Sequence, residues 1–195
     1  AVWWKSSRSA RRCGATGKMA DAVIAKSAAC QRALLADGYS ANRFYRIDLG
    51  FAAGPVRSAE SRRLARKALC LVNSDLATHG DSPVVICTAR MTRESGVNLL
   101  VKAARHLLAR YPDLRLWFIG DGPQRDSIYE TMRADGVRAS IAMPGSFCDV
   151  DDLFAAADIF LQTDDDGLDF FLPNAISAEL PIVTLDTEST RTVIS

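Results

Sequence analysis

The sequence is poor in the residues that build metal sites and disulfide frameworks. Only two histidines and five cysteines occur among its 195 residues, and no two cysteines form a C-x-x-C pair. Neither histidine stands at metal-ligand spacing, so a zinc site and a disulfide scaffold are disfavoured. We expect free thiols in a reducing cytoplasm, with Cys87 buried inside an apolar strand.

Long apolar runs and an excess of charge are missing as well. No apolar stretch approaches the roughly 20 residues needed to cross a bilayer. The 24 basic and 23 acidic residues leave a net charge of +1, which gives no reason to expect nucleic acid or an anionic membrane as the main partner. The first residues lack an initiating methionine and the apolar core of a signal peptide. We therefore expect a cytoplasmic chain that is truncated at one or both ends.

The sequence does contain a regular alternation of apolar strands and amphipathic helices. The continuous apolar run at residues 84–89 predicts a strand covered on both faces. Residues 97–110 predict a helix, because their apolar side chains recur on one face. Strands are expected at residues 19–27, 44–47, 84–89, 114–119, 140–143, 158–162 and 182–185, and helices at 28–36, 58–72, 97–110, 123–135 and 150–157. This order predicts an α/β fold with a doubly wound parallel sheet.

The domain boundary is expected towards the end of the first half of the chain. A Gly-Pro pair at residues 54–55 breaks the chain before the basic amphipathic helix at 58–72, whose apolar side is expected to include Leu64, Ala68, Leu69 and Val72. The polar, glycine-containing residues 73–83 suit a linker. We therefore assign residues 1–80 to the end of one domain with its linker, and residues 81–195 to a second domain.

Residues 163–181 carry the most informative pattern: an acidic cluster, a glycine, an apolar run and a closing Leu-Pro. Their order is similar to a motif of retaining glycosyltransferases of the GT-B fold, family 4. In that family Glu-Gly-Phe-Gly is followed by a second Glu, Ala-Met-Ala and Gly-Leu-Pro. Aligned without gaps, Asp166 takes the place of the first Glu and Asn174 that of the second. Gly167 and Leu168 take the places of the first Gly and the Phe.

A second motif lies between the strand at 84–89 and the helix at 97–110. It resembles the family's "vGRl…KG" loop, which grips the diphosphate of a nucleotide-sugar donor. Arg90 matches the Arg and Gly96 the Gly, while Ser95 stands where the family has Lys. Negative charge builds on a departing diphosphate, so cations and helix N-termini stabilise it. The alternatives are an ion-pair role for Arg90 and a helix-capping role for Ser95.

Two glycine turns complete the resemblance. Residues 120–125 resemble the "GdGp-r" turn of the family, either as a donor contact or as a tight turn in which Asp121 caps the next helix. A dinucleotide fingerprint is excluded, because Arg125 stands where its third glycine belongs. Gly145 matches a turn of the family near which the nucleotide base lies. The alternative is that this glycine has only a structural role in the turn.

The resemblance implies the C-terminal donor-binding domain of a retaining hexosyltransferase, incomplete at its C-terminus and preceded by the last elements of its N-terminal domain. It implies catalytic roles for Arg90 and Asp166, the latter on the donor sugar. The implied donor-binding residues are Arg90, Ser95, Gly96, Gly145, Gly167, Leu168 and, on the ribose, Asn174.

As a family these enzymes need no metal, and no cofactor is expected besides the nucleoside diphosphate sugar as donor substrate. The acceptor hydroxyl would belong to a glycan, a lipid or a small molecule. The missing N-terminal domain would supply the acceptor site and any peripheral membrane contact, so the chain by itself is expected to be inactive.

Two alternatives remain open from the sequence. One is a degenerate, non-catalytic GT-B-like domain for binding or assembly, which the altered positions Ser95, Asp166 and Asn174 favour and Arg90 with the intact glycine turns disfavours. The other is a GT-B sugar-nucleotide epimerase or phosphorylase. The acids at residues 164–166 also suit a solvated turn, and Asn174 suits the cap of a short helix after Pro173. A calcium loop is disfavoured because these acids are consecutive.

Overall fold

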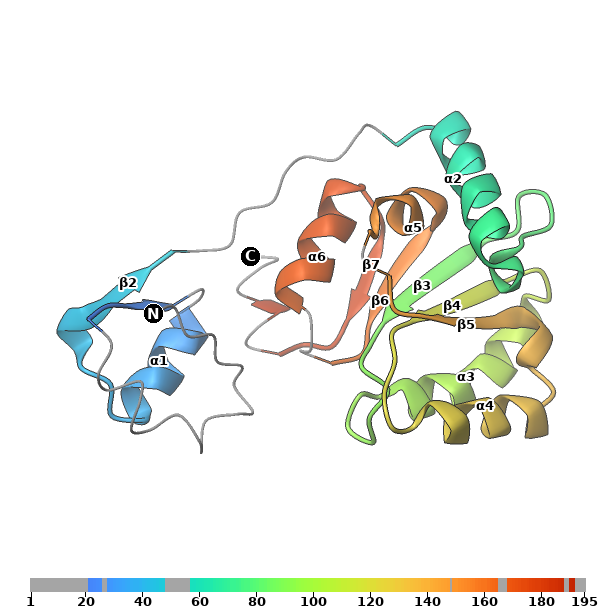
Figure 1. Ribbon diagram of the computed structural model, residues 1–195. Helices are drawn as coiled ribbons and strands as arrows, with labels where there is room; N and C mark the ends of the chain where they lie inside the picture. The colour runs from blue at the N-terminus through green and yellow to red at the C-terminus, as the bar shows by residue number, and fades with distance from the viewer. Residues whose placement is uncertain are drawn as a thin grey trace. The chain divides into compact units, whose positions relative to one another are not determined.

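The computed structural model describes residues 21–25, 28–47, 57–147, 149–164, 168–187 and 190–191. The chain divides into two compact units, residues 1–50 with 191–195 and residues 51–190. Figure 1 labels their elements.

The first unit is a small parallel β-α-β arrangement. Strands β1 (Val23–Ala25) and β2 (Phe44–Arg46) pair in parallel, and α1 (Ala28–Ala36) connects them, followed by the 3-10 turn η2 (Ala41–Arg43). Gly38 ends α1 in a left-handed conformation with φ of 86°, as its sequence position predicts. The rest of the strand expected at 19–27, the basic residues 1–16 and the turn at 48–51 lie outside the described residues.

The second unit is built on a five-stranded parallel sheet with the order β5-β4-β3-β6-β7. Its strands are β3 (Val84–Thr88), β4 (Arg115–Ile119), β5 (Ile141–Gly145), β6 (Ile159–Gln162) and β7 (Ile182–Thr184). The chain moves outward from β3 to β5 and then returns to the other side of β3 with β6 and β7. The predicted doubly wound parallel sheet is confirmed.

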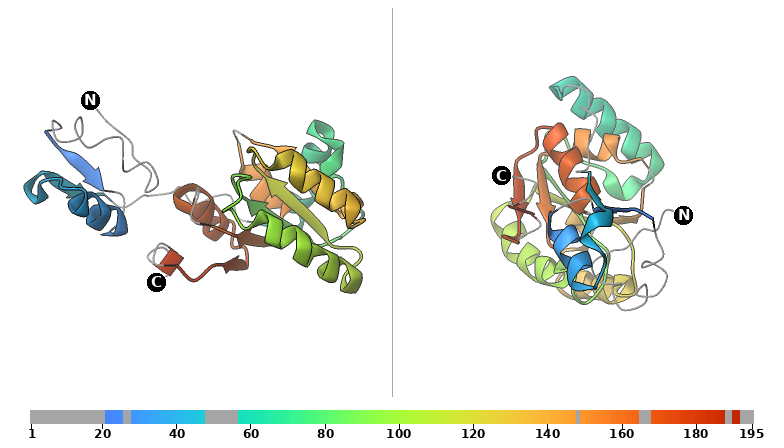
Figure 2. Two further views of the ribbon diagram at one scale, coloured as in Figure 1. Left: turned by 90° about the horizontal axis from the view of Figure 1, so that it is seen from below. Right: turned by 90° about the vertical axis from the view of Figure 1, so that its left-hand side faces the viewer.

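Helices cover both faces of this sheet. The helices are α2 (Ala59–Val72), α3 (Val97–Arg110), α4 (Arg125–Ala134), α5 (Asp151–Ala156) and α6 (Leu168–Ser177), with 3-10 turns η3 (Ser74–Leu76) and η4 (Arg138–Ser140). α3 and α4 lie side by side on one face, and α2, α5 and α6 lie on the other (Figures 1 and 2). Among the described residues, no helix is long and apolar enough to span a bilayer.

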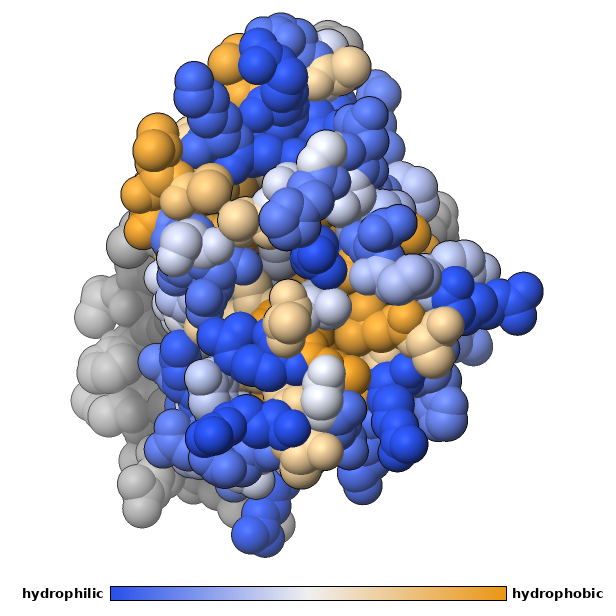
Figure 3. All heavy atoms as spheres, turned by 90° about the vertical axis from the view of Figure 1, so that its right-hand side faces the viewer, coloured by the Kyte–Doolittle hydropathy of each residue, from blue (hydrophilic) through white to orange (hydrophobic). Residues whose placement is uncertain are grey.

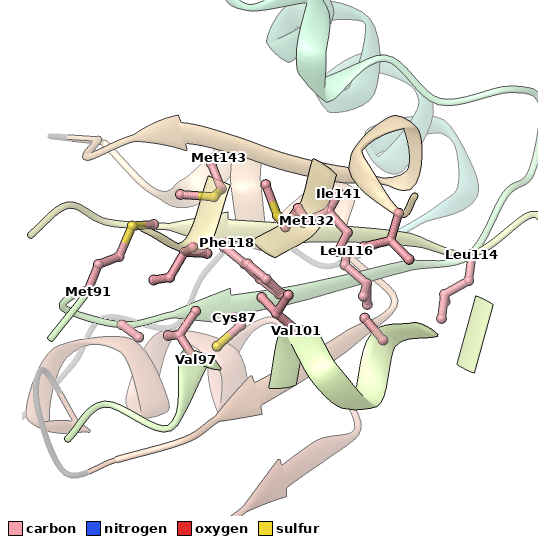
Figure 4. Packing of buried hydrophobic residues seen from close by; sticks show 14 residues of the cluster. Cys87, Met91, Val97, Val101, Leu114, Leu116, Phe118, Met132, Ile141 and Met143 are labelled. Atoms are coloured by element: carbon pink, nitrogen blue, oxygen red, sulfur yellow. The ribbon is translucent and has the colours of Figure 1, made fainter. Parts of the chain in front are cut away.

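A dense apolar core joins α3 and α4 to the sheet (Figure 4). Val101 of α3, Met132 of α4 and Phe118 of β4 are all 1% exposed or less. Each fully buried side chain of this size contributes about 1.5–3 kcal/mol relative to an exposed one. The apolar face that the spacing predicted for residues 97–110 is therefore the face that packs, and this helix has the predicted bounds.

Helix α2 packs through a face that overlaps only partly with the one expected, at Leu69. It buries Ala65, Arg66 and Leu69, whereas Leu64 and Val72 are 52% and 74% exposed. The outward side of α2, at the top of Figure 3, consequently mixes hydrophilic and hydrophobic side chains. The physical cause is an ion-pair network at the amino-terminal edge of the sheet.

Asp158, which precedes β6, is the centre of that network. Its carboxylate accepts from Arg57 at 3.1 Å, Arg62 at 2.6 Å, Arg66 at 2.7 Å and the Val84 N–H at 2.9 Å. Burial by itself would raise the pKa of this carboxyl, but the Val84 N–H and the guanidinium groups lower it below its usual value.

The same network joins α2 to the rest of the second unit. Arg66 also donates to the carbonyls of Ala156 and Ser82, each at 3.0 Å, and Arg57 donates to the carbonyl of Ala157. The second compact unit begins at residue 51, before α2. The domain boundary expected between residues 80 and 81 stays a prediction. The assignment of the preceding residues to the end of an N-terminal domain stays a prediction.

Candidate functional site

The carboxyl-terminal edge of the sheet collects the loops that carry the sequence motifs. Because the strands are parallel, the segments after β3, β4, β5 and β6 all emerge at this edge. β3 and β6 are neighbours, but β3 leads to α3 on one face and β6 to α6 on the other. Ligands of open α/β sheets bind where neighbouring strands diverge in this way.

Arg90 is the exposed cation at this edge. It lies directly beyond β3, and across the described residues its guanidinium makes no hydrogen bond or ion pair. A planar guanidinium presents a fork of N–H donors that matches phosphate oxygens. The ion-pair alternative for Arg90 therefore has no support in this part of the structure.

Ser95 lies inside the β3–α3 loop and not at its surface. It is 1% exposed, and its hydroxyl donates to the carbonyl of Thr92 at 2.9 Å. The N-cap of α3 is Gly96, without a side-chain cap bond, so the capping role considered for Ser95 is wrong. Its role at a phosphate stays a prediction, and in this conformation the hydroxyl is engaged by the loop.

Gly96 marks a close crossing between this loop and the end of β6. Its φ is 72°, and a Cβ there would lie 2.9 Å from the Thr163 carbonyl oxygen. The Thr163 hydroxyl donates to the Ser95 carbonyl at 2.6 Å at the same crossing. Gly96 therefore has a packing role here, in addition to its proposed place at the donor.

The turn after β4 uses its glycines to pass close to the end of β3. A Cβ on Gly120 would lie 2.1 Å from the Ala89 carbonyl oxygen, and one on Gly122 would lie 2.5 Å from that of Met91. These distances support the tight-turn alternative. Asp121 does not cap α4: its Oδ1 accepts from the Gly122 N–H at 2.7 Å, and the N-cap of α4 is Gln124.

Gly145 ends β5 in a left-handed conformation with φ of 98°. Its carbonyl accepts from the Gly120 N–H at 2.9 Å, which joins the turns after β4 and β5. Arg125 donates to the Met143 carbonyl at 2.8 Å and so holds the end of β5. The contact of Gly145 with a nucleotide base stays a prediction.

Helix α6 begins earlier than the motif suggested. It starts at Leu168, so Pro173 and Asn174 lie inside it, and the capping alternative for Asn174 is wrong. The Asn174 side-chain N–H donates to the Phe170 carbonyl at 2.6 Å. Asp166, Gly167 and the side chain of Leu168 lie outside what the structure describes, so their roles stay predictions.

Buried polar side chains at the ends of β3 and β6 were missed as functional candidates. Thr88, Gln162 and Asp164 are 0%, 2% and 8% exposed, and Gln162 donates to the Asp164 carbonyl at 2.7 Å. Thr163 stands between the last two and reaches Ser95. The signal in the sequence was the change from apolar to polar residues at the end of each strand.

A cavity lies elsewhere, at the amino-terminal edge. It has a volume of about 640 Å³ and lies between α2 and residues 78–81. Arg62, Arg63 and Arg66 line it, but each pairs with a carboxylate. We therefore place the candidate site at the carboxyl-terminal edge. No three His, Cys, Asp or Glu side chains of the described residues are grouped as a metal site requires.

Comparisons with known proteins agree with this fold. The model of the family "Glycosyl transferases group 1" matches residues 82–195. The lipopolysaccharide core biosynthesis glycosyltransferase LpsE of Rhizobium meliloti (strain 1021) is 29% identical over 97 residues, which are 50% of this chain and 27% of that protein. The putative glycosyltransferase EpsD of Bacillus subtilis (strain 168) is 25% identical over 144 residues, 72% of this chain and 35% of that protein.

Among solved structures, that of Anabaena Alr3699/HepE in complex with UDP-glucose matches with a TM-score of 0.76 and 20% identity. The match covers 98% of this chain and 52% of that one, so the chain spans about half the length of this structural relative. The family match takes in all five strands of the parallel sheet and the loops at its carboxyl-terminal edge. The chain belongs to the family of glycosyl transferases group 1.

Proposed function

We propose that this chain is the donor-binding part of a retaining, family 4 glycosyltransferase of the GT-B type. The reaction would move a hexose from a nucleoside diphosphate sugar to an acceptor hydroxyl. The observation that carries the proposal is Arg90, an exposed and unpaired cation of the described structure, next to the strand divergence of β3 and β6. Family membership and the UDP-glucose complex of the structural relative support it.

The physics of the leaving group explains why such an edge is useful. Negative charge develops on the diphosphate as the glycosidic bond breaks, and preorganised cations and N–H groups stabilise it. Helix α3 presents its first N–H groups at this edge, and its first turn holds no acidic residue that would oppose an anion. Arg90 and the N-terminus of α3 would together hold the diphosphate.

The remaining roles follow from the family resemblance. Asp166 would bind the donor sugar, with Gly167 and Leu168 beside the diphosphate. Asn174 would meet the ribose through its amide oxygen, since its amide nitrogen is used within α6. Ser95, Gly96 and Gly145 would line the donor site.

We propose that the acceptor binds to an N-terminal domain that this chain does not include. The chain spans about half of its structural relative, and the acceptor hydroxyl, on a glycan, lipid or small molecule, would be bound by the N-terminal domain. In this proposal the enzyme is cytoplasmic, uses neither metal nor cofactor, and meets a membrane only through that domain. The isolated chain would bind a nucleotide weakly and turn over no donor.

Calorimetric titration tests the nucleotide site directly. UDP, GDP and ADP are titrated into the wild type, Arg90→Ala and the control Arg105→Ala, which removes an exposed arginine from α3. Hydrogen bonds to charged groups predict a loss of about ten- to a hundredfold in affinity for Arg90→Ala. Arg105→Ala is expected to bind like the wild type.

A second candidate is a non-catalytic domain of the same fold. The observation that favours it is the buried Ser95, which supplies no charge where the family has lysine and bonds to Thr92. Equal, negligible heats for the wild type and Arg90→Ala would favour this candidate. An epimerised donor or a released monosaccharide in a nucleotide-sugar panel would instead indicate an epimerase or a phosphorylase.

A further inference from the structure

A continuous path of hydrogen bonds runs from the end of β6 to Arg90. The Thr163 hydroxyl donates to the Ser95 carbonyl at 2.6 Å. The Ser95 hydroxyl donates to the Thr92 carbonyl at 2.9 Å, and the Thr92 N–H donates to the Arg90 carbonyl at 2.7 Å. Every link is a side-chain or backbone bond within one loop, except the first, which crosses between neighbouring strands.

The first hydrogen bond, from Thr163 to Ser95, lies where the loop and the end of β6 pass close to each other. At this point Gly96 and Thr163 approach so closely that a Cβ on Gly96 would lie 3.1 Å from the Thr163 Cβ. The Cys87 thiol neighbours the same hydroxyl, with its Sγ 3.9 Å from the Thr163 Oγ1. Burial raises the pKa of this thiol to about 12, so it stays uncharged and does not compete as an ionic partner.

We propose that Thr163 is a positioning residue that holds the β3–α3 loop, and through it Arg90, in the conformation that receives the diphosphate. Thr163 does not touch the ligand in this proposal. Its hydroxyl fixes the Ser95 carbonyl, and Ser95 then holds the turn that follows Arg90. The part that concerns ligand affinity rests on the proposed function, whereas the part that concerns the loop does not.

Amide hydrogen exchange tests the loop without any ligand. Thr163→Val keeps the shape of the side chain and removes its donor, while Thr163→Ser restores the donor. Loss of this partly buried hydrogen bond predicts about three- to tenfold faster exchange of the amides at residues 92–97 in Thr163→Val. Thr163→Ser is expected to exchange like the wild type.

Thr131→Val is the matched control for this measurement. The Thr131 hydroxyl also donates to a backbone carbonyl, that of Ser127 at 2.9 Å, but it does so within α4. We expect this variant to leave residues 92–97 unchanged. Unchanged exchange of residues 92–97 in Thr163→Val would overturn the proposal, as would equal acceleration in Thr131→Val.

A double-mutant cycle tests whether Thr163 acts through Arg90. The nucleoside diphosphate that binds the wild type most tightly is titrated by NMR into Thr163→Val, Arg90→Ala and the double variant. We expect Thr163→Val to lose about three- to tenfold in affinity in the wild-type background, and to lose nothing further once Arg90 is absent. An equal loss in both backgrounds would contradict the positioning role.

Failure of the two proposals can be told apart. If the wild type binds none of UDP, GDP and ADP, the proposed nucleotide site fails, and the exchange measurement by itself decides whether Thr163 holds the loop. If the wild type binds and Thr163→Val binds equally well, the nucleotide site stands and the role of Thr163 is wrong.

Discussion

The two edges of the parallel sheet differ in whether their arginines are paired with a carboxylate. At the amino-terminal edge Asp158 accepts from three arginines, and the side chain of Arg66 is only 8% exposed. At the carboxyl-terminal edge Arg90 is exposed and, within the described structure, meets no carboxylate. A cation that is paired and buried holds elements of the fold together, whereas an unpaired one at a strand divergence is free to meet an anionic ligand.

The first test of this contrast is Asp158→Ala. Removing one carboxylate leaves three guanidinium groups without their shared partner, and breaking such a partly buried network costs about 3 kcal/mol in the free energy of unfolding. Chemical denaturation measures the change. The control is Asp75→Ala, which removes a more exposed pair with Arg138 and is expected to cost less than about 1 kcal/mol.

A loss of nucleotide affinity in the folded Asp158→Ala protein would contradict the separation of the two edges. Equal costs for Asp158→Ala and Asp75→Ala would show that the network contributes no more to stability than an ordinary surface pair.

A second test compares two glycines with the same backbone conformation. Gly96 and Gly136 have φ of 72° and 68°, but a Cβ on Gly136 meets nothing within 4 Å. Gly136→Ala is therefore expected to cost about 1–2 kcal/mol for the left-handed backbone alone. Gly96→Ala is expected to cost about 1–3 kcal/mol more, since its Cβ would overlap the Thr163 carbonyl.

Only Gly96→Ala is expected to weaken nucleotide binding, because only Gly96 lies at the carboxyl-terminal edge. Denaturant unfolding and nucleotide titration of both variants check these expectations. Equal unfolding costs for the two variants would show that the crossing with Thr163 is not tight in solution.

The pH dependence of the unfolding free energy tests the ion pairs of Asp158 at the amino-terminal edge. The folded-state pKa of Asp158 is lowered from its ordinary 3.8. Its stabilising effect is therefore present above that pH and is lost as the pH falls through the lower folded-state value. We expect the difference in unfolding free energy between the wild type and Asp158→Asn to shrink on acidification below pH 3.8. A difference that does not change with pH would contradict this.

The smallest expected effect is a difference in chemical reactivity between two cysteine thiols. The Cys87 thiol is 1% exposed and its pKa is raised by burial to about 12, whereas Cys70 is exposed on α2. Because the thiolate is the nucleophile, iodoacetamide at pH near 8 is expected to modify Cys70 and spare Cys87 in the folded protein. Peptide mass spectrometry identifies the modified residue, and rapid labelling of Cys87 would show that the core opens.

Local patterns in the sequence predicted much of the fold. The bounds of α3 were predicted correctly because its apolar residues recur regularly along the chain. The start of α6 was predicted too late: the sequence indicated a helix after Pro173, whereas α6 begins at Leu168 and continues through that proline. Asp121 was expected to cap α4, but the turn after β4 is shaped by contact with Ala89 and Met91.

The candidate site was predicted in part. The sequence placed Arg90 and Gly96 in one loop between a strand and a helix, and the structure shows that this loop leaves β3 at the edge where β3 and β6 diverge. It did not predict that Ser95 is buried or that Thr163 reaches it. Those contacts depend on the register between neighbouring strands, which a strand's own residues do not specify.

By itself, then, the sequence determined the order and type of most elements and the loops that carry the motifs, because these depend on periodicity and turn chemistry along short stretches. Only the tertiary structure decided which face of α2 is buried and which polar side chains are engaged. Arg66 and Asp158 are 92 residues apart in the chain. Their attraction offsets the cost of removing water from around the two charges, and α2 therefore buries Arg66 and not the whole apolar side that its own sequence indicates.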